Sequence, residues 1–253
     1  MRGNPVKQAL AAGERAVGAF LVEFNSLGIP RMLAAAGAEF VMWDQEHSGW
    51  SVETLRPLIL AAHAAEIVPM VRVPALQQPM ISAVLDAGAM GVMAPMIESA
   101  EHARQLVEAA RYPPQGRRGV GPHYADEMDA DLPSTLERMN RELLVLAMVE
   151  TTAGVENVAE IAAVDGLDVL WIGHGDLTTS LGIPGQFGDR RFLDALDTIF
   201  AAARAHDKAV GFLCISPDDA RLAVSRGVRC IGLGDRPLYD AALRAAQAAA
   251  RES

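Results

Sequence analysis

Two carboxylates follow two apolar runs in the second half of the chain. Glu150 ends the run LLVLAMVE, and Asp176 ends the run DVLWIGHGD. Apolar runs of this kind are typical of buried strands, and neighbouring strands lie only about 4.8 Å apart. Both side chains could therefore reach one cation at about 2.0–2.2 Å, a distance typical of Mg²⁺. The pattern predicts a divalent-metal site with Glu150 and Asp176 as ligands.

A second group of ionisable side chains follows the apolar run 39–44. Asp44, Glu46 and His47 combine two carboxylates with an imidazole. An imidazole beside a carboxylate is a natural general base, because the acid fixes its tautomer and stabilises its charged form. Arg72 interrupts another apolar run, PMVRVP, where a buried guanidinium must meet a carboxylate or an anionic ligand. His47, Asp44 and Arg72 are the candidate catalytic residues.

Each of these residues also has a structural explanation. Asp44 or Glu46 could cap the helix expected near Ser51, and Glu150 and Asp176 could cap the helices that follow them. Arg72 could form an ion pair that serves only the fold. Other positions are equally open: the glycines of IGLGD (231–235) could grip a phosphate, although a tight turn is favoured, and His174 is a lining residue or a nitrogen ligand.

Composition narrows the class of protein. Apolar residues make up 51% of the 253 positions and charged residues 21%, which is typical of a globular domain. The net charge of −10, with no basic run, argues against a nucleic-acid partner. No stretch resembles a signal peptide or a membrane span. The two cysteines lack metal-site spacing, so we expect buried thiols and a cytoplasmic protein.

The apolar runs alternate with helical segments along the whole chain. Eight such βα units of about 30 residues each predict a parallel sheet closed into a (β/α)8 TIM barrel, an α/β fold. A doubly wound open sheet is the alternative, but the glycine-rich first turn expected of it is absent. The expected strands are 16–22, 39–44, 67–73, 91–96, 143–149, 168–173, 209–214 and 228–234.

We expect one domain over residues 1–253. The segment 111–135 is rich in Gly, Pro and charge, which predicts a long loop at a lid or interface, although a linker is possible on composition alone. A C-terminal helix should begin at about residue 237. Ser51, Ser99 and Ser216 are expected to cap helices. Four glycines that precede strands are expected to end helices: Gly37, Gly88, Gly166 and Gly227.

At these residues the chain resembles the metal-dependent (class II) 2-oxo-acid aldolases of the 4-hydroxy-2-oxoheptanedioate aldolase family. The resemblance runs from about Gly18 to the last helix. It rests on DQEH (44–47), VRVP (71–74), LDAG (85–88), RYPPQGRRGVG (111–121), VET (149–151) and IGHGDLTTSLG (172–182).

The resemblance implies roles for individual residues. Glu150 and Asp176 would bind Mg²⁺, Mn²⁺ or Co²⁺, Arg72 would face the enolate oxygen, and His47, paired with Asp44, would handle protons. It also implies a homohexamer, in which Asp86 approaches a neighbouring subunit's site. The substrate would contact Arg72, the backbone amides of Gly175 and Asp176, and the positions Phe20, Met148 and His174.

Three positions depart from the family pattern. Phe20 stands where relatives often carry Trp, Met148 where they commonly have Gln, and His174 where they commonly have Pro. These changes concern the pocket and the surroundings of the expected ion, not its ligands. They put the choice of donor and metal in doubt.

The function expected is a metal-dependent aldolase that joins or separates the enolate of a 2-oxo acid, pyruvate or hydroxypyruvate, and an aldehyde. The only lysines, Lys7 and Lys208, do not end a strand, so no Schiff-base residue is available. Alternatives on the same site are an oxaloacetate-type decarboxylase or a CoA-ester lyase. A barrel that binds a sugar acid without catalysis is the alternative from another class.

Overall fold

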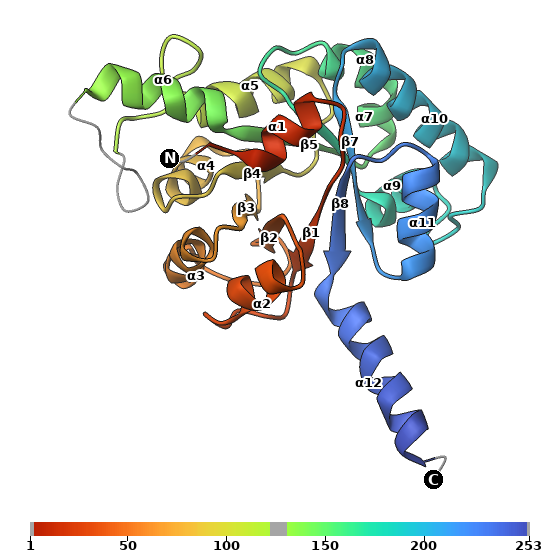
Figure 1. Cartoon of the computed structure of the whole chain (residues 1–253). Helices are drawn as coiled ribbons and strands as arrows, with labels where there is room; N and C mark the ends of the chain where they lie inside the picture. Colours follow the sequence, from red (N-terminus) through yellow and green to blue (C-terminus); the bar gives the residue numbers. More distant parts are fainter. Residues whose placement is uncertain (1–2, 122–130, 252–253) are drawn as a thin grey trace.

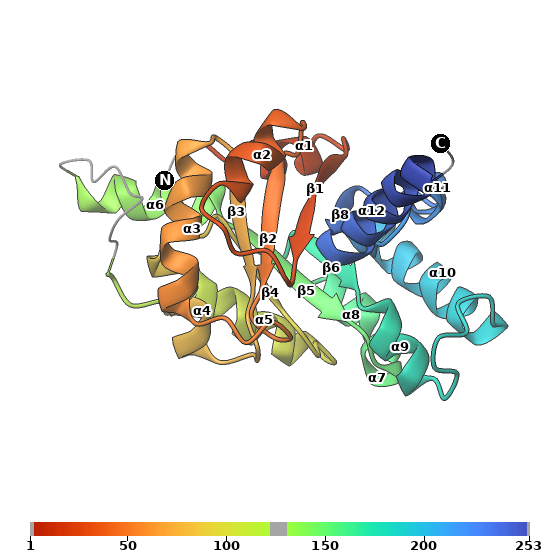
Figure 2. The same ribbon diagram turned by 90° about the horizontal axis from the view of Figure 1, so that it is seen from below.

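The computed structural model describes residues 3–121 and 131–251. Eight parallel strands form a closed barrel in sequence order, with β1 pairing with both β2 and β8 (Figure 1 and Figure 2). This closure confirms the TIM barrel and excludes the open sheet. The strands are β1 (Ala16–Leu21), β2 (Phe40–Asp44), β3 (Val68–Arg72), β4 (Gly91–Ala94), β5 (Leu144–Val149), β6 (Val169–Ile172), β7 (Ala209–Cys214) and β8 (Cys230–Gly234).

Helices follow the strands around the barrel. Within the described residues, none of these helices has the length and apolar character that crossing a membrane requires. The helices are α1 (Pro5–Ala11), α2 (Ile29–Ala35), α3 (Val52–Ala64), α4 (Gln78–Asp86), α5 (Ala100–Ala110), α6 (Leu132–Glu142), α7 (Thr152–Glu156), α8 (Val158–Ala162), α9 (His174–Ser180), α10 (Arg190–Ala205), α11 (Pro217–Ser225) and α12 (Asp235–Arg251).

The inside of the barrel is filled by large side chains placed opposite glycines. Trp171 is fully buried within the interior cluster. A side chain at Gly211 would overlap its indole, and a Cβ at Gly232 would lie 3.0 Å from it. Phe40 similarly occupies the space beside Gly18. The glycines of β7 and β8 therefore give Trp171 its room, and the barrel is a packed core rather than a pore.

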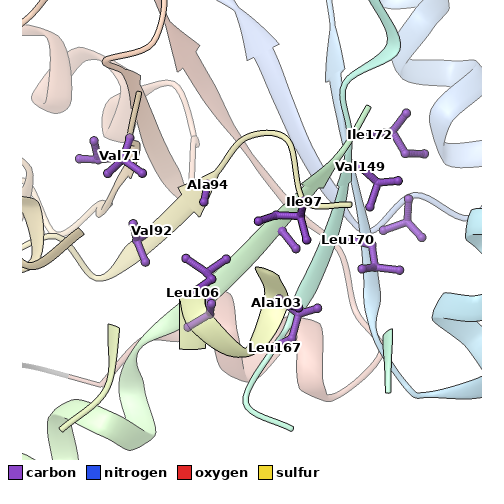
Figure 3. Close-up of a cluster of buried hydrophobic side chains, with 14 of the residues drawn as sticks. Val71, Val92, Ala94, Ile97, Ala103, Leu106, Val149, Leu167, Leu170 and Ile172 are labelled. Atoms are coloured by element: carbon purple, nitrogen blue, oxygen red, sulfur yellow. The ribbon is translucent and has the colours of Figure 1, made fainter. Parts of the chain in front are cut away.

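A second apolar cluster lies between the outer faces of the strands and the helices. Successive strand residues point to opposite faces, so β5 gives Leu146 and Met148 to the interior and Val145, Ala147 and Val149 to this outer layer. Figure 3 shows part of this layer, where Val149 and Ile172 lie near Ile97 and side chains of α5. The alternation leaves the last interior-facing position of each strand pointing into the carboxyl end of the barrel.

The helix boundaries follow the expected signals. Ser51, Ser99 and Ser216 each accept a backbone hydrogen bond as the N-cap of α3, α5 and α11. The four helix-ending glycines all have positive φ, between 85° and 105°. The long loop predicted to end near residue 135 ends earlier, because Asp131 caps α6 and Leu132 begins it. The middle of that loop, 122–130, lies outside the described residues.

The C-terminal helix α12 differs from the others. It begins at Asp235 rather than near 237, since proline at the third position is tolerated in the first turn of a helix. None of its residues is buried, and Figure 1 shows it running away from the barrel. Val17, on the strand β1 beside it, has an exposed fraction of 36%. This helix therefore leaves the adjoining barrel wall partly uncovered.

Candidate active site

Glu150 lies directly after β5 and is almost completely buried, with 2% of its surface exposed. Its Oε1 accepts a hydrogen bond of 2.7 Å from the backbone N–H of Met96. Its Oε2 is buried without a hydrogen-bond partner among the described residues. A side chain at Gly173, the residue after β6, would overlap this oxygen. The glycine therefore allows the carboxylate of one strand to lie against the end of the next.

The surroundings of Glu150 disfavour its negative charge. The pKa of its carboxyl is raised to about 7, chiefly by burial and also by the charges of Glu46 and Asp176, against the lowering effects of the Met96 N–H and of Arg72. Asp176 lies in the first turn of α9, just beyond the neighbouring strand. Glu150 and Asp176 thus belong to one electrostatic cluster at the carboxyl end of the barrel.

Arg72 ends β3 and forms a two-pronged ion pair with Asp44 at the end of β2. Its Nε donates to Asp44 Oδ1 at 2.8 Å, and its Nη2 donates to Oδ2 at 2.6 Å. The register places these two residues directly opposite one another. Both are buried, Asp44 completely. The ion pair weighed as a structural explanation for Arg72 is therefore present, and it fixes the plane of the guanidinium.

The remaining nitrogen of the guanidinium turns toward the middle of the site. Arg72 Nη1 lies 3.0 Å from Glu46 Oε2 and donates to Met148 Sδ at 3.4 Å. The Phe20 ring lies beneath the guanidinium, 5.2 Å from its carbon. Burial alone would lower the pKa of Arg72, but Asp44, Glu46 and Glu150 raise it above its usual value. Arg72 therefore stays positively charged, with Phe20 and Met148 in contact with its guanidinium.

His47 lies at the rim, with 58% of its side chain exposed. The carboxylate beside it is Glu46, whose Oε2 is 3.9 Å from His47 Nε2. The resemblance implies a pairing of His47 with Asp44, but the carboxylate found beside His47 is that of Glu46. The oxygens of Asp44 accept from Arg72, and Oδ1 also accepts the N–H of Glu46. Burial raises the pKa of Glu46, and the charge of Arg72 opposes that rise. Glu46 therefore links the histidine to the guanidinium.

His174 and Gly175 occupy different surroundings. The His174 ring stacks on Phe212 at 4.8 Å and meets Phe187 edge-on at 5.4 Å. With these rings it lines an apolar cavity of about 140 Å³ beside α10 and α11. Burial lowers the pKa of His174. Gly175 is exposed in the first turn of α9, next to Asp176. The structure thus brings Gly175 to the rim and turns His174 toward the helices.

The helix-capping alternative does not account for the acids of the site. Thr151 caps α7 through its hydroxyl, which accepts the N–H of Gly154, and the N-cap of α9 is Gly173. The carboxylate of Glu150 instead binds Met96, which has a positive φ of 56°. Local sequence carries no signal for this left-handed methionine. The importance of Gly173 could have been inferred from its place beside Glu150 in the strand order.

Two further expectations concern residues outside this cluster. Asp86 accepts a 2.6 Å hydrogen bond from the buried Arg118 of its own chain. The tight turn favoured for IGLGD is not seen, because β8 ends at Gly234 and α12 begins at the next residue, Asp235. The Asp235 carboxylate, rather than a bound phosphate, meets the N–H groups of residues 22–24 there.

The arrangement can hold a divalent cation. Arg72 neutralises Asp44, which leaves Glu46, Glu150 and Asp176 as an excess of negative charge. In residues 3–121 and 131–251, no group of three or more His, Cys, Asp or Glu side chains is arranged to hold a metal ion. Two carboxylate ligands, with water and substrate completing the shell, fit Mg²⁺ and similar hard cations. The unpartnered Oε2 of Glu150 is the observation that favours such an ion.

Comparisons with known proteins agree with this geometry. Residues 18–236 match the family model described as HpcH/HpaI aldolase/citrate lyase. The 2-keto-3-deoxy-L-rhamnonate aldolase of Escherichia coli (strain K12) is 34% identical over 242 residues, 95% of this chain and 90% of the relative.

Two solved structures are similar over almost the whole chain. The crystal structure of the citrate synthase SbnG is 35% identical, with a TM-score of 0.87 over 98% of this chain and 97% of that one. An HpcH/HpaI aldolase/citrate lyase family protein from Burkholderia cenocepacia J2315 is 30% identical, with a TM-score of 0.91 over 98% and 99%. The chain belongs to the HpcH/HpaI aldolase/citrate lyase family and is a carbon–carbon lyase of the aldolase type.

Proposed function

We propose that this protein is a divalent-metal-dependent aldolase acting on the bond between a 2-oxo acid unit, pyruvate or hydroxypyruvate, and an aldehyde. The observation that carries this proposal is the buried, unpartnered Oε2 of Glu150 beside Asp176 and the fixed guanidinium of Arg72. The E. coli relatives named 2-keto-3-deoxy-L-rhamnonate aldolase support a 2-keto-3-deoxy acid as substrate. By its connectivity, aldol cleavage of such an acid gives pyruvate.

Glu150 and Asp176 would hold Mg²⁺, Mn²⁺ or Co²⁺. When bound, such a cation supplies Lewis-acid stabilisation of the negative charge on an enolate. Arg72 adds a second positive charge, held in place by Asp44. Removing one preorganised donor of this kind commonly costs about 2.7–4 kcal/mol of transition-state stabilisation.

The protein residues divide the remaining work. His47 takes the proton from the aldol hydroxyl as the carbon–carbon bond breaks, with Glu46 beside it to balance the imidazolium charge. The electrons of the broken bond become those of the enolate, which is protonated at its carbon to complete the 2-oxo acid. Phe20 and Met148 wall the pocket beside Arg72. The backbone amides of Gly175 and Asp176 bind the substrate carboxylate. His174 holds this first turn of α9 in place by stacking its ring on Phe212.

We also propose a homo-oligomer, a hexamer by resemblance, located in the cytoplasm. The wholly unburied helix α12 and the partly uncovered strand β1 support an assembly. Burial raises the pKa of Cys214 to about 11 and that of Cys230 to about 12, so both free thiols stay protonated and unreactive, in keeping with a reducing compartment.

The test is an aldehyde panel assayed with pyruvate and with hydroxypyruvate under defined metal. EDTA should abolish cleavage and synthesis, and Mg²⁺, Mn²⁺ or Co²⁺ should restore them. Glu150→Gln should lose activity, whereas Glu156→Gln, an exposed acid of α7, should keep it. Activity that survives thorough chelation would overturn the metal role, and the absence of any carbon–carbon chemistry across the panel would overturn the aldolase.

A further inference from the structure

The first residue of α12 holds a loop more than two hundred residues earlier in the chain. Asp235 Oδ2 accepts three successive backbone N–H groups, from Val22 at 3.1 Å, Glu23 at 2.9 Å and Phe24 at 3.1 Å. Its other oxygen accepts the N–H of Arg236 at 2.8 Å. Hydrogen bonds to an ionised acceptor are roughly twice as strong as those between neutral groups. One carboxylate therefore holds the whole start of this loop.

The loop in question, residues 22–28, leaves the carboxyl end of β1 and will be called the mouth loop. It begins two residues after Phe20, whose ring lies beneath Arg72. The Val22 side chain packs against the interior cluster that contains Phe20, Met148 and Trp171. Val22 thus gives its backbone N–H to Asp235 and its side chain to the interior cluster of the barrel.

A second contact joins the same two segments. The rings of Phe24 and Tyr239 meet edge-on, with their centroids 5.6 Å apart. Tyr239 lies four residues after Asp235 and therefore on the same face of α12. The mouth loop is thus held at its backbone by a charge and at a side chain by an aromatic pair.

We propose that Asp235 is a positioning residue for catalysis, which fixes the mouth loop to α12 and, through Val22, the pocket wall beside Arg72. The carboxylate charge is essential to this role, because a neutral amide oxygen is a weaker acceptor for three converging N–H groups. The C-terminal helix thereby becomes a structural support of the pocket, although it lies outside the barrel. The consequence for catalysis rests on the proposed aldolase function; the anchoring itself does not.

Hydrogen exchange measures the anchoring directly. In Asp235→Asn we expect the amides of residues 22–24 to exchange at least about tenfold faster, because each loses a charge-assisted partner. The matched control is Asp240→Asn, which removes the same charge from an exposed position of the same helix. Tyr239→Leu removes the aromatic contact with Phe24 and should give a smaller increase in the exchange rate of the same amides. This second variant tests the anchoring even if Asp235→Asn folds poorly. Unchanged exchange in both Asp235→Asn and Tyr239→Leu would overturn the proposal.

Kinetics then measure the positioning. We expect Asp235→Asn to raise KM for the 2-oxo acid severalfold more than it lowers kcat, while Asp235→Glu recovers part of the loss and Asp240→Asn behaves as wild type. Faster exchange with unaltered kinetic constants would overturn the positioning role. Wild-type protein inactive on every donor and aldehyde would instead refute the aldolase, and the exchange result would still decide the anchoring.

Discussion

At the scale of single residues, the site combines a fully compensated charge with an uncompensated one. Arg72 and Asp44 satisfy each other in a buried two-pronged pair. Glu150 has one oxygen bound to Met96 and the other without a partner among the described residues. A buried carboxylate in this condition costs stability in the metal-free protein. Neutralising Glu150 is therefore expected to stabilise the metal-free protein, whereas replacing Arg72 is expected to destabilise it.

Glu150→Gln should stabilise the metal-free protein at pH 8. The folded-state pKa of about 7 lies above the ordinary value of 4.5, so the folded state holds this proton more tightly than the unfolded state. Stability from this group is therefore lost as pH rises from about 4.5 to about 7, by roughly 3.5 kcal/mol, at about 1.4 kcal/mol per tenfold change in proton affinity. Thermal melts with EDTA should show this decline in wild type and less of it in the variant. An equal decline in both proteins would contradict the assignment.

Arg72→Lys should separate the structural role of Arg72 from its catalytic one. Lysine keeps a positive charge near Asp44 but cannot form the parallel pair and reach Met148 and Glu46 together. We expect turnover to fall by about 10²–10³, with a smaller loss of stability than in Arg72→Ala, where an unpaired buried Asp44 costs about 3–5 kcal/mol. Steady-state kinetics and thermal melts of both variants provide the measurement. Full activity in the lysine variant would limit Arg72 to the fold.

At the scale of elements, the site depends on how β5 and β6 are joined. Val149 pairs with Ile172, so the residues that follow these strands, Glu150 and Gly173, are neighbours. The missing side chain at Gly173 is the space that the carboxylate uses. Asp176 then follows in the first turn of α9. Strand register and one glycine together place the two acids in one cluster.

Gly173→Ala should displace the Glu150 carboxylate, because the added methyl group would overlap Oε2. We expect weaker metal binding and lower activity, with some loss of stability from overpacking, typically about 1–3 kcal/mol. For metal binding, the control is Gly175→Ala, two residues later in the same segment, since a Cβ there meets nothing within 4 Å. Metal titration calorimetry would distinguish the two. Equal affinities in both variants would contradict the role of Gly173 in placing Glu150 for metal binding.

At the scale of the whole molecule, α12 is the element that the barrel does not bury. It carries Tyr239 and Leu243 with exposed fractions of 55% and 42%. Met32 of α2 and Val17 of β1 are also exposed, at 65% and 36%. Apolar side chains gathered outside a folded core commonly mark a contact with another protein. This supports an assembly in which α12 is covered.

Leu243→Glu should shift the assembly toward smaller species, because it places a charge in the apolar face of α12. Ala245→Glu, two residues later and therefore on the opposite face of the same exposed helix, introduces the same charge away from Leu243 and should leave the mass unchanged. Light scattering coupled to size-exclusion chromatography measures both. A wild-type protein that is monomeric at all concentrations would refute the proposed oligomer.

The strands and the rim of the site could be predicted from sequence, because apolar runs mark buried strands and polar residues stand where they end. Asp44, Arg72, Glu150 and Asp176 all follow from that rule. The pairing of the side chains could not be predicted from sequence. Asp44 meets Arg72 because the register of β2 and β3 places the two residues opposite one another. Likewise, His174 continues the outward alternation of Ile172 toward Phe212, a signal that was present in the strand period.

Other features depend on tertiary structure alone. The positive φ of Met96 lies outside the preferences of a non-glycine residue and persists because its N–H binds Glu150. The departure of α12 from the barrel has no local cause either, since its sequence is an ordinary amphipathic helix. Such features arise from contacts between distant segments, which sequence patterns do not encode one by one.

The indole of Trp171, seated between Gly211 and Gly232, closes the barrel below Glu150. In the part of the chain that the structure describes, reactants would therefore enter and leave the proposed site from the carboxyl end of the barrel. In the proposed reaction, the product held by Arg72 and by the amides of Gly175 and Asp176 would leave after the product nearer the solvent. The packing of Trp171 inside the barrel would thus set the order in which the two products are released.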